Sequence, residues 1–231
     1  MAPVAAAVPV EIWNLWYTVT LGGSTKHMYF NEKFVKKDGK VQYSYLAYKA
    51  EEGYLNEEQL GAFALDRSDL VPLFYNFRSS YRSTETKIDG TVQNQPKGFL
   101  LRIRVNKGGS DLPVIQVQLP PRTFFSAMAA PWLSYRIQSM KPGQTVQFFA
   151  AIEDHLDSEF KPQGGAFRLE SPDAVAKSIP GGGHRLSLSF KGIVSTWWVD
   201  RRGALFRMET PELKMVIERT TEELAKKFLD D

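Results

Sequence analysis

The fold is decided by the stretch STWWVDRRGALFRME, residues Ser195–Glu209. Two runs of β-prone residues flank the turn sequence Asp-Arg-Arg-Gly in this stretch. Because aspartate can hydrogen-bond its own backbone and glycine accepts a positive φ, the segment predicts a β-hairpin. A third predicted strand covers residues 213–218, and a predicted helix covers residues 220–229. The C-terminal part is therefore expected to be antiparallel sheet with a docked helix.

The rest of the chain repeats the same kind of pattern. Apolar residues alternate with polar ones, as in residues 99–105, which places one face of each strand in a core and the other in water. We expect strands at residues 13–21, 41–48, 99–105, 114–119, 185–190, 194–200 and 204–209. Asp89-Gly90 reads as a further turn. The predicted fold class is mainly β: a large curved antiparallel sheet, or half-open β-barrel.

Two helical segments complete this prediction. Residues 124–140 carry apolar side chains near helical spacing, with Pro131 inside the run, and predict a helix or broken helix that plugs the concave face, with Trp132 and Ile137 inward. The C-terminal helix should be capped by Thr220 or Thr221, with the following apolar side chains on one face. Those side chains, expected to dock on the sheet, are Leu224 and Phe228.

Composition excludes several classes of protein. The 231 residues carry a net charge of only +3 and no cysteine, so a basic nucleic-acid surface, disulfides and thiolate chemistry are not expected. No apolar run is long enough for a transmembrane helix. Residues 1–10 are interpreted as a linker after a removed signal or lipid-anchor segment, with a disordered natural N-terminus as the alternative. Residues 11–231 are expected to form a single β-barrel-like domain.

Motifs for catalysis or cofactors are weak. The three histidines lack the spacing of a zinc site, and the acidic run 153–159 lacks the pattern of a calcium loop, so that run reads as a solvated loop. Nucleophile-elbow and phosphate-loop sequences are absent. We therefore predict no catalytic residue, no metal site and no cofactor. A carboxylate pair for glycoside hydrolysis stays open, because nothing in the sequence marks a particular pair.

Large aromatic rings are the remaining signal. Rings adjacent on a strand point to opposite faces, so each of the pairs 148–149 and 197–198 places one ring on either side of the sheet. Apolar rings inside a curved sheet are typical of small barrels that hold apolar ligands. The residues expected to bind such a ligand are Trp16, Phe125, Trp132, Phe148 and Trp197.

Several short motifs, in their order along the chain, carry a family resemblance. They are Trp16–Val19 with Gly22-Gly23, Ile88–Val92, Lys141–Val146, Thr196–Asp200 with Gly203, and Arg219–Ala225. In this order they resemble a bacterial cell-envelope domain that often precedes transglutaminase-like catalytic domains. The resemblance spans residues 11–229. It implies a half-open antiparallel barrel with a helix across its mouth, similar to the lipoprotein-carrier fold, and no ligand-binding residue of those carriers is transferred.

The resulting interpretation is a non-enzymatic binding domain of the bacterial cell envelope, periplasmic or anchored at the outer membrane. Its expected partner is an apolar small molecule such as a lipid or acyl chain, or an envelope protein, held on the concave face. No nucleic acid is expected, and a lipid anchor upstream of residue 2 fits the small-residue linker. Two alternatives stand beside it: a hydrolase of cell-wall sugar or peptide that uses a carboxylate pair, and a structural protein-interaction module.

Overall fold

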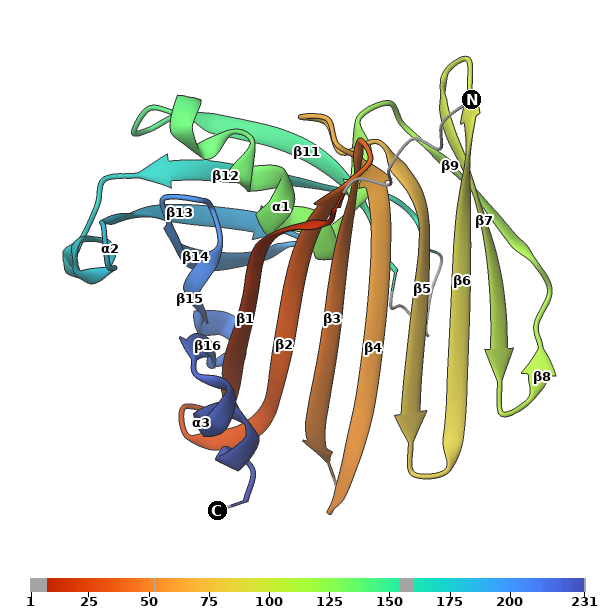
Figure 1. Ribbon diagram of the computed structural model, residues 1–231, viewed down its shortest axis with the longest axis horizontal. Helices are drawn as coiled ribbons and strands as arrows, with labels where there is room; N and C mark the ends of the chain where they lie inside the picture. Colours follow the sequence, from red (N-terminus) through yellow and green to blue (C-terminus); the bar gives the residue numbers. More distant parts are fainter. Residues whose placement is uncertain (1–7, 52, 154–159, 231) are drawn as a thin grey trace.

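The protein is built on one continuous curved sheet of sixteen strands, shown as a computed structural model in Figure 1. The structure describes residues 8–51, 53–153 and 160–230. The strands are β1 (Val10–Leu21), β2 (Thr25–Lys37), β3 (Lys40–Glu51), β4 (Tyr54–Leu65), β5 (Pro72–Tyr81), β6 (Thr84–Gln95), β7 (Gly98–Lys107), β8 (Ser110–Asp111), β9 (Ile115–Leu119), β10 (Thr123–Phe125), β11 (Thr145–Ala151), β12 (Gln163–Glu170), β13 (Gly183–Phe190), β14 (Ile193–Asp200), β15 (Leu205–Thr210) and β16 (Met215–Thr220).

Helices are few and short in the part of the chain that the structure describes. The α-helices are α1 (Ala129–Ser134), α2 (Ala174–Ser178) and α3 (Glu222–Lys227), and the 3₁₀ turns are η1 (Ser126–Met128), η2 (Ile137–Ser139) and η3 (Pro211–Leu213). The mainly β, unclosed architecture predicted from the sequence is confirmed. Each of the seven predicted strand segments coincides with a strand, and β9 and β15 begin one residue later than predicted. No described helix is long and apolar enough to cross a membrane.

The strand order places the first and last strands side by side in the middle of the sheet. It runs β10-β11-β12-β13-β14-β15-β16-β1-β2-β3-β4-β5-β6-β7-β8, with β9 also paired to β7. Tyr17 of β1 lies opposite Arg219 of β16, in antiparallel register. Figure 1 shows β11–β13 crossing the end of the long meander β1–β6. The sheet curls back far enough for Phe125 of β10 to pack edge-on against Tyr75 of β5, with ring centroids 5.2 Å apart.

The core lies inside this curl. In β7, Leu101, Ile103 and Val105 are buried while the arginines between them are exposed, as the alternation predicts. The plug predicted for residues 124–140 is a broken helix, made of η1, α1 and η2 after the short strand β10. Trp132 and Ile137 are buried in it, with only 4% and 1% of their surfaces exposed.

Turn chemistry decides the C-terminal hairpin. The amide of Gly203 donates to the carbonyl of Asp200 (2.9 Å), Gly203 has a φ of +86°, and Asp200 Oδ1 accepts the amide of Arg202 (2.9 Å). This is the turn predicted for the sequence Asp-Arg-Arg-Gly. By contrast, the turn predicted at Asp89-Gly90 is wrong, because both residues lie inside β6 and Gly90 pairs with Tyr75.

The N-terminal expectation needs one correction. Residues 1–7 of the predicted linker lie outside the described residues, and Val10, expected as its last residue, already belongs to β1 and pairs with Lys36 of β2. The regular structure therefore starts one residue before the predicted boundary at residue 11.

The C-terminal helix α3 packs on β1 and β2, capped by Thr221, whose hydroxyl accepts the amide of Leu224 at 3.3 Å. Docking of Leu224 on the sheet is wrong, because 60% of its surface is exposed. Ala225 is fully buried instead and provides the close approach, while Phe228 is half-buried beneath Lys26.

This placement makes α3 a modest contributor to stability. Deleting residues 222–231 leaves β16 intact and removes the burial of Ala225 and of part of Phe228. We expect the free energy of unfolding to fall by about 1–2 kcal/mol, since full burial of one large apolar side chain contributes about 1.5–3 kcal/mol. In a chain of this length that corresponds to a melting temperature lower by roughly 2–8 °C, measurable by circular dichroism. The matched control Leu224→Ser, at the exposed position, should leave it unchanged. An unchanged melting temperature on deletion would contradict the docking of α3.

Candidate ligand-binding cavity

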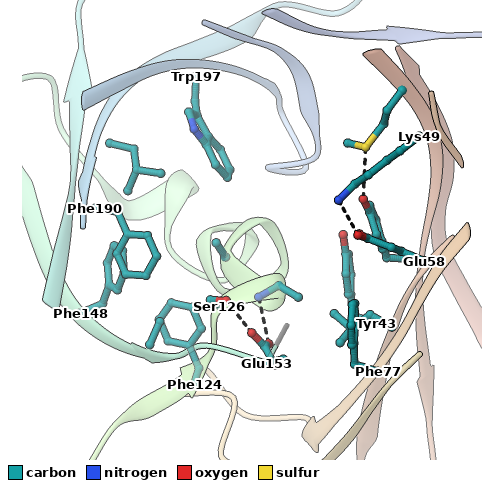
Figure 2. Close-up of a pocket in the computed structure, with 17 residues that line it drawn as sticks. Tyr43, Lys49, Glu58, Phe77, Phe124, Ser126, Phe148, Glu153, Phe190 and Trp197 are labelled. Atoms are coloured by element: carbon teal, nitrogen blue, oxygen red, sulfur yellow. Dashed lines mark hydrogen bonds and ion pairs between the residues drawn. The ribbon is translucent and has the colours of Figure 1, made fainter. Parts of the chain in front are cut away.

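A cavity of about 430 Å³ lies inside the curl of the sheet. Figure 2 shows that its residues come from two opposed walls: Lys49, Glu58, Tyr43 and Phe77 on one side, and Trp197, Phe190, Phe148 and Phe124 on the other. The lining is formed by Met28, Tyr43, Tyr45, Lys49, Glu58, Leu60, Phe77, Phe124, Ser126, Ala127, Ala129, Phe148, Ala150, Glu153, Leu188, Phe190 and Trp197. The volume is within the range of small-molecule sites.

The apolar wall is a cluster of aromatic rings on β10, β11 and β13. Phe148 packs against Phe124 and Phe190, with ring centroids 5.3 and 5.7 Å apart. Phe148 points inward because it sits on the core-facing register of β11, while its neighbour Phe149 is 47% exposed on the other side. Trp132 stacks on Phe124 from behind (5.0 Å) and holds that ring in place.

Gly165 on β12 makes room for this wall. It lies opposite Phe148 in the β11–β12 pair, and a Cβ atom at Gly165 would sit 2.4 Å from Cζ of Phe148. The absence of a side chain lets the Phe148 ring lie across the neighbouring strand and reach Phe190. The cavity wall therefore depends on a glycine that does not itself line the cavity.

An ion pair marks the more exposed end of the cavity. Lys49 Nζ lies 2.5 Å from Glu58 Oε1, across the β3–β4 pair, and 27% and 20% of the two side chains are exposed. Next to this pair, the Tyr45 hydroxyl contacts the Met28 sulfur at 3.6 Å. The apolar cavity thus has one polar rim, which suits a ligand with an apolar body and a polar end.

A buried carboxylate lies on the opposite side. Glu153 has only 1% of its surface exposed and accepts hydrogen bonds from Ser126 Oγ (2.5 Å) and from the amide of Ala127 (3.0 Å). These bonds tie the start of the plug to the end of β11. The prediction of a solvated acidic loop over 153–159 is therefore wrong for Glu153, and residues 154–159 lie outside the described residues.

Behind the cavity, Tyr43 joins it to a buried polar network. The Tyr43 hydroxyl donates to Glu32 Oε2 (3.0 Å), and the Tyr17 hydroxyl lies 2.8 Å from Glu32 Oε1. Burial raises the pKa of Glu32, and burial together with the Glu32 carboxylate raises the pKa of both tyrosines well above the usual value. The hydroxyls therefore stay protonated and act as donors to the carboxylate.

The predicted ligand-binding residues divide into three groups. Phe148 and Trp197 line the cavity. Phe125 and Trp132 are buried in the core around it and support its wall rather than line it. Trp16 lies on the other face of the sheet, between Tyr29 and Lys226 of α3, and takes no part in the cavity.

The sequence reasoning missed the polar residues of the cavity, namely Lys49, Glu58, Ser126 and Glu153. Nothing in their local sequence separates them from surface residues, because the cavity forms only when β3 and β4 meet the plug. Their one local signal is that Lys49 and Glu58 occupy the same alternating positions as the buried Ala47 and Leu60.

The hydrolase alternative requires two carboxylates across a polar cleft. Glu57 and Glu85 flank a shallow polar hollow of about 260 Å³, two strands apart. The side chain of Glu85 is 54% exposed and pairs with Lys87. Glu57 Oε1 accepts a hydrogen bond from the side-chain amide of Gln59. These carboxylates therefore lie on an open polar surface and already have polar partners. Within the described residues, no three potential metal ligands of the His, Cys, Asp and Glu types come together.

Comparison with known proteins shows the fold. No protein-family model and no curated protein sequence matches the chain. Among solved structures, the chain is similar to a β-barrel-like protein of the domain of unknown function DUF1849 from Brucella abortus, with a TM-score of 0.55, 8% identity, and coverage of 90% of this chain and 94% of that one. A DUF1089 family protein from Pseudomonas aeruginosa aligns with a TM-score of 0.45 and 14% identity, over 84% of this chain and 94% of that one. The chain therefore shares the β-barrel-like fold of the DUF1849 protein.

Proposed function

We propose that this protein is a non-enzymatic binding domain of the bacterial cell envelope that holds one apolar chain, such as an acyl chain, in the cavity between β2–β5 and the aromatic wall. The observation that supports this function is the cavity itself: about 430 Å³, lined by seventeen residues of which only Lys49, Glu58 and Glu153 are charged. The periplasmic or outer-membrane location rests on the sequence resemblance, and cell fractionation tests it.

The size of the cavity limits the ligand. At the roughly 30 Å³ that one water molecule occupies in the liquid, the cavity holds on the order of 14 non-hydrogen atoms. That is one alkyl chain of medium length and not a lipid with two or three chains. The chain would contact Phe148 and Leu188, and its polar end would lie at the Lys49–Glu58 rim.

Binding of saturated fatty acids of 8 to 18 carbons, measured by isothermal titration calorimetry, is the direct test. Each added methylene should tighten binding about fourfold, since burying one contributes about 0.8 kcal/mol. The gain should stop at roughly 14 carbons, where the cavity is full. Native mass spectrometry of the purified protein should show a co-purified species of this size. A protein that binds none of these acids would contradict the proposed function.

A cavity-filling variant separates this site from non-specific binding. Ala129→Phe places a ring at a half-buried lining position and should weaken binding by at least about tenfold while the protein stays folded. The matched control is Val194→Phe, which adds a similar ring on β14 at a position that is 54% exposed and outside the cavity. Equal affinity of Ala129→Phe and Val194→Phe would place the ligand elsewhere.

A further inference from the structure

A second hollow, of about 350 Å³, lies on the outer face of the long meander, on the side of the sheet opposite the cavity. Most of its side chains come from the registers of β2–β5 that alternate with the core positions, as at Gln42, Ser44 and Asn76, whose neighbours Tyr43 and Tyr75 are buried. The residues that line it are Asn31, Gln42, Ser44, Tyr45, Leu46, Gln59, Leu60, Gly61, Phe63 and Asn76. Two of them, Tyr45 and Leu60, belong to the core register and also line the cavity, and the other eight belong to the outer register. None of the lining residues carries a charge, although 24% of the residues of the protein do.

Several polar groups of this second hollow, called the outer-face groove below, are free to bind a ligand. Within the part of the chain that the structure describes, the side chains of Gln42, Ser44 and Asn76 have no hydrogen-bond partner. Asn31 is held in a fixed orientation, because its Nδ2 donates to Asn14 Oδ1 (2.7 Å) and to the Leu15 carbonyl (3.0 Å). Its own carbonyl oxygen is thereby presented as an acceptor.

The floor of the groove is a glycine. Gly61 lies opposite both Ser44 of β3 and Asn76 of β5, and a Cβ atom at this position would come 2.6 Å from Asn76 Oδ1. The Asn76 amide therefore extends over the backbone of β4, into space that any other residue would fill. This arrangement gathers polar side chains from three adjacent strands at one point.

An aromatic pair lies beside the amide groups. Phe63, which lines the groove, stacks on Phe74 of β5 with ring centroids 4.2 Å apart and an interplanar angle of 16°. Phe74 exposes 41% of its surface. Exposed rings beside unpaired amides offer an apolar platform and hydrogen-bonding groups within one groove.

We propose that the outer-face groove binds a neutral carbohydrate chain. Sugar hydroxyls both donate and accept hydrogen bonds, which matches the amides of Gln42 and Asn76 and the hydroxyl of Ser44. The C–H faces of the sugar rings pack on Phe63 and Phe74.

A phosphate-bearing ligand is less favoured, because it requires arginine or lysine and none lines the groove. Lys33 and Arg78 border the groove opposite Ser44 and Gln59, and Lys33 is paired with Glu11. A peptide strand does not fit, because β2–β5 are paired on both sides and leave no free backbone edge.

The test uses the full chain labelled with ¹⁵N and three neutral linear tetrasaccharides: cellotetraose, maltotetraose and chitotetraose. Because the groove is shallow, we expect a dissociation constant in the millimolar range for at least one of them. The side-chain amide signals of Gln42, Gln59 and Asn76 should shift on titration, while those of Gln93 and Gln116 should not. If no tetrasaccharide shifts these signals at about 10 mM, or if sodium phosphate shifts them instead, the proposal is overturned.

Variants assign the binding to the groove. The double substitution Gln42→Ala/Asn76→Ala should lower the affinity at least about tenfold, and Phe74→Ala should do the same. The matched control Gln93→Ala removes an exposed amide from β6, outside the groove, and should bind like the unchanged protein. Fatty-acid binding in the cavity should be unaffected by all of these variants, which separates this proposal from the one for the cavity. Affinity that survives both groove variants, in proteins with an unchanged melting temperature, would overturn it.

Discussion

Gly90→Val is expected to lower the free energy of unfolding by about 3 kcal/mol or more, the upper part of the range for overpacked interiors. Gly90 of β6 lies opposite Tyr75, and a Cβ atom there would sit 2.0 Å from Cε1 of the Tyr75 ring. The ring is 1% exposed and is packed against Phe125, so it has no free space to move into. The substitution forces β5 and β6 apart at the point where the sheet curls onto β10.

Thermal unfolding followed by circular dichroism measures this effect. For a chain of this size, 3 kcal/mol corresponds to a melting temperature lower by roughly 6–12 °C. Gly164→Val is the matched control, because it makes the same change in a strand where a Cβ atom would have only Phe149 nearby, at 3.7 Å. If both variants have the same melting temperature, the contact with Tyr75 is not the reason that position 90 requires glycine.

Arg219→Met is expected to destabilise the protein by about 3 kcal/mol, the upper part of the range for the loss of hydrogen bonds from a charged group. From β16, Arg219 donates to the Leu205 carbonyl (2.7 Å), the Ala204 carbonyl (2.9 Å) and Asp200 Oδ2 (3.1 Å). Only 18% of its side chain and 11% of that of Asp200 are exposed. The variant removes the donor that joins these three acceptors, and the Asp200 carboxylate then keeps Arg202 as its charged partner, while the Leu205 carbonyl keeps the Tyr17 hydroxyl.

The neighbouring Arg207→Met provides the control for this second prediction. Arg207 pairs with Glu209 and Glu218 at the surface, with 30% of its side chain exposed, so its removal should cost no more than about 1 kcal/mol. Urea unfolding of the two variants gives both free energies directly. Equal destabilisation by the two variants would mean that the contacts of Arg219 contribute no more than a surface pair.

Local patterns were sufficient to predict most of the fold. Alternation identified strands such as β7, and the Asp200–Gly203 turn was read correctly because its chemistry is contained in four residues. The turn predicted at Asp89-Gly90 was wrong because Gly90 makes room for the ring of Tyr75 on the neighbouring strand β5. No local signal reveals that contact. Leu224 misled for a related reason: Ala225, not the larger residue, faces β1 and β2.

The cavity was only partly predictable. Adjacent rings indicated that Phe148 and Trp197 face opposite ways from their neighbours, and both line the cavity. Trp16 was predicted to bind the ligand with them, but the sequence does not say which of two neighbouring rings faces the core, and in β1 that residue is Tyr17. The polar rim depends on the register between β3 and β4, which local sequence patterns do not specify.

The pairing of the first strand with the last has a consequence for how the protein is made. During synthesis, β1 can pair with β2 within seconds, but its other edge has no partner until β16, which begins at Met215, leaves the ribosome. At about 5–20 residues per second, that edge stays open for roughly 10–40 s. An unpaired edge is a template for association with other chains. The newborn chain is therefore vulnerable to aggregation in this interval, and a factor that shields β1 during translation should raise the yield of folded protein.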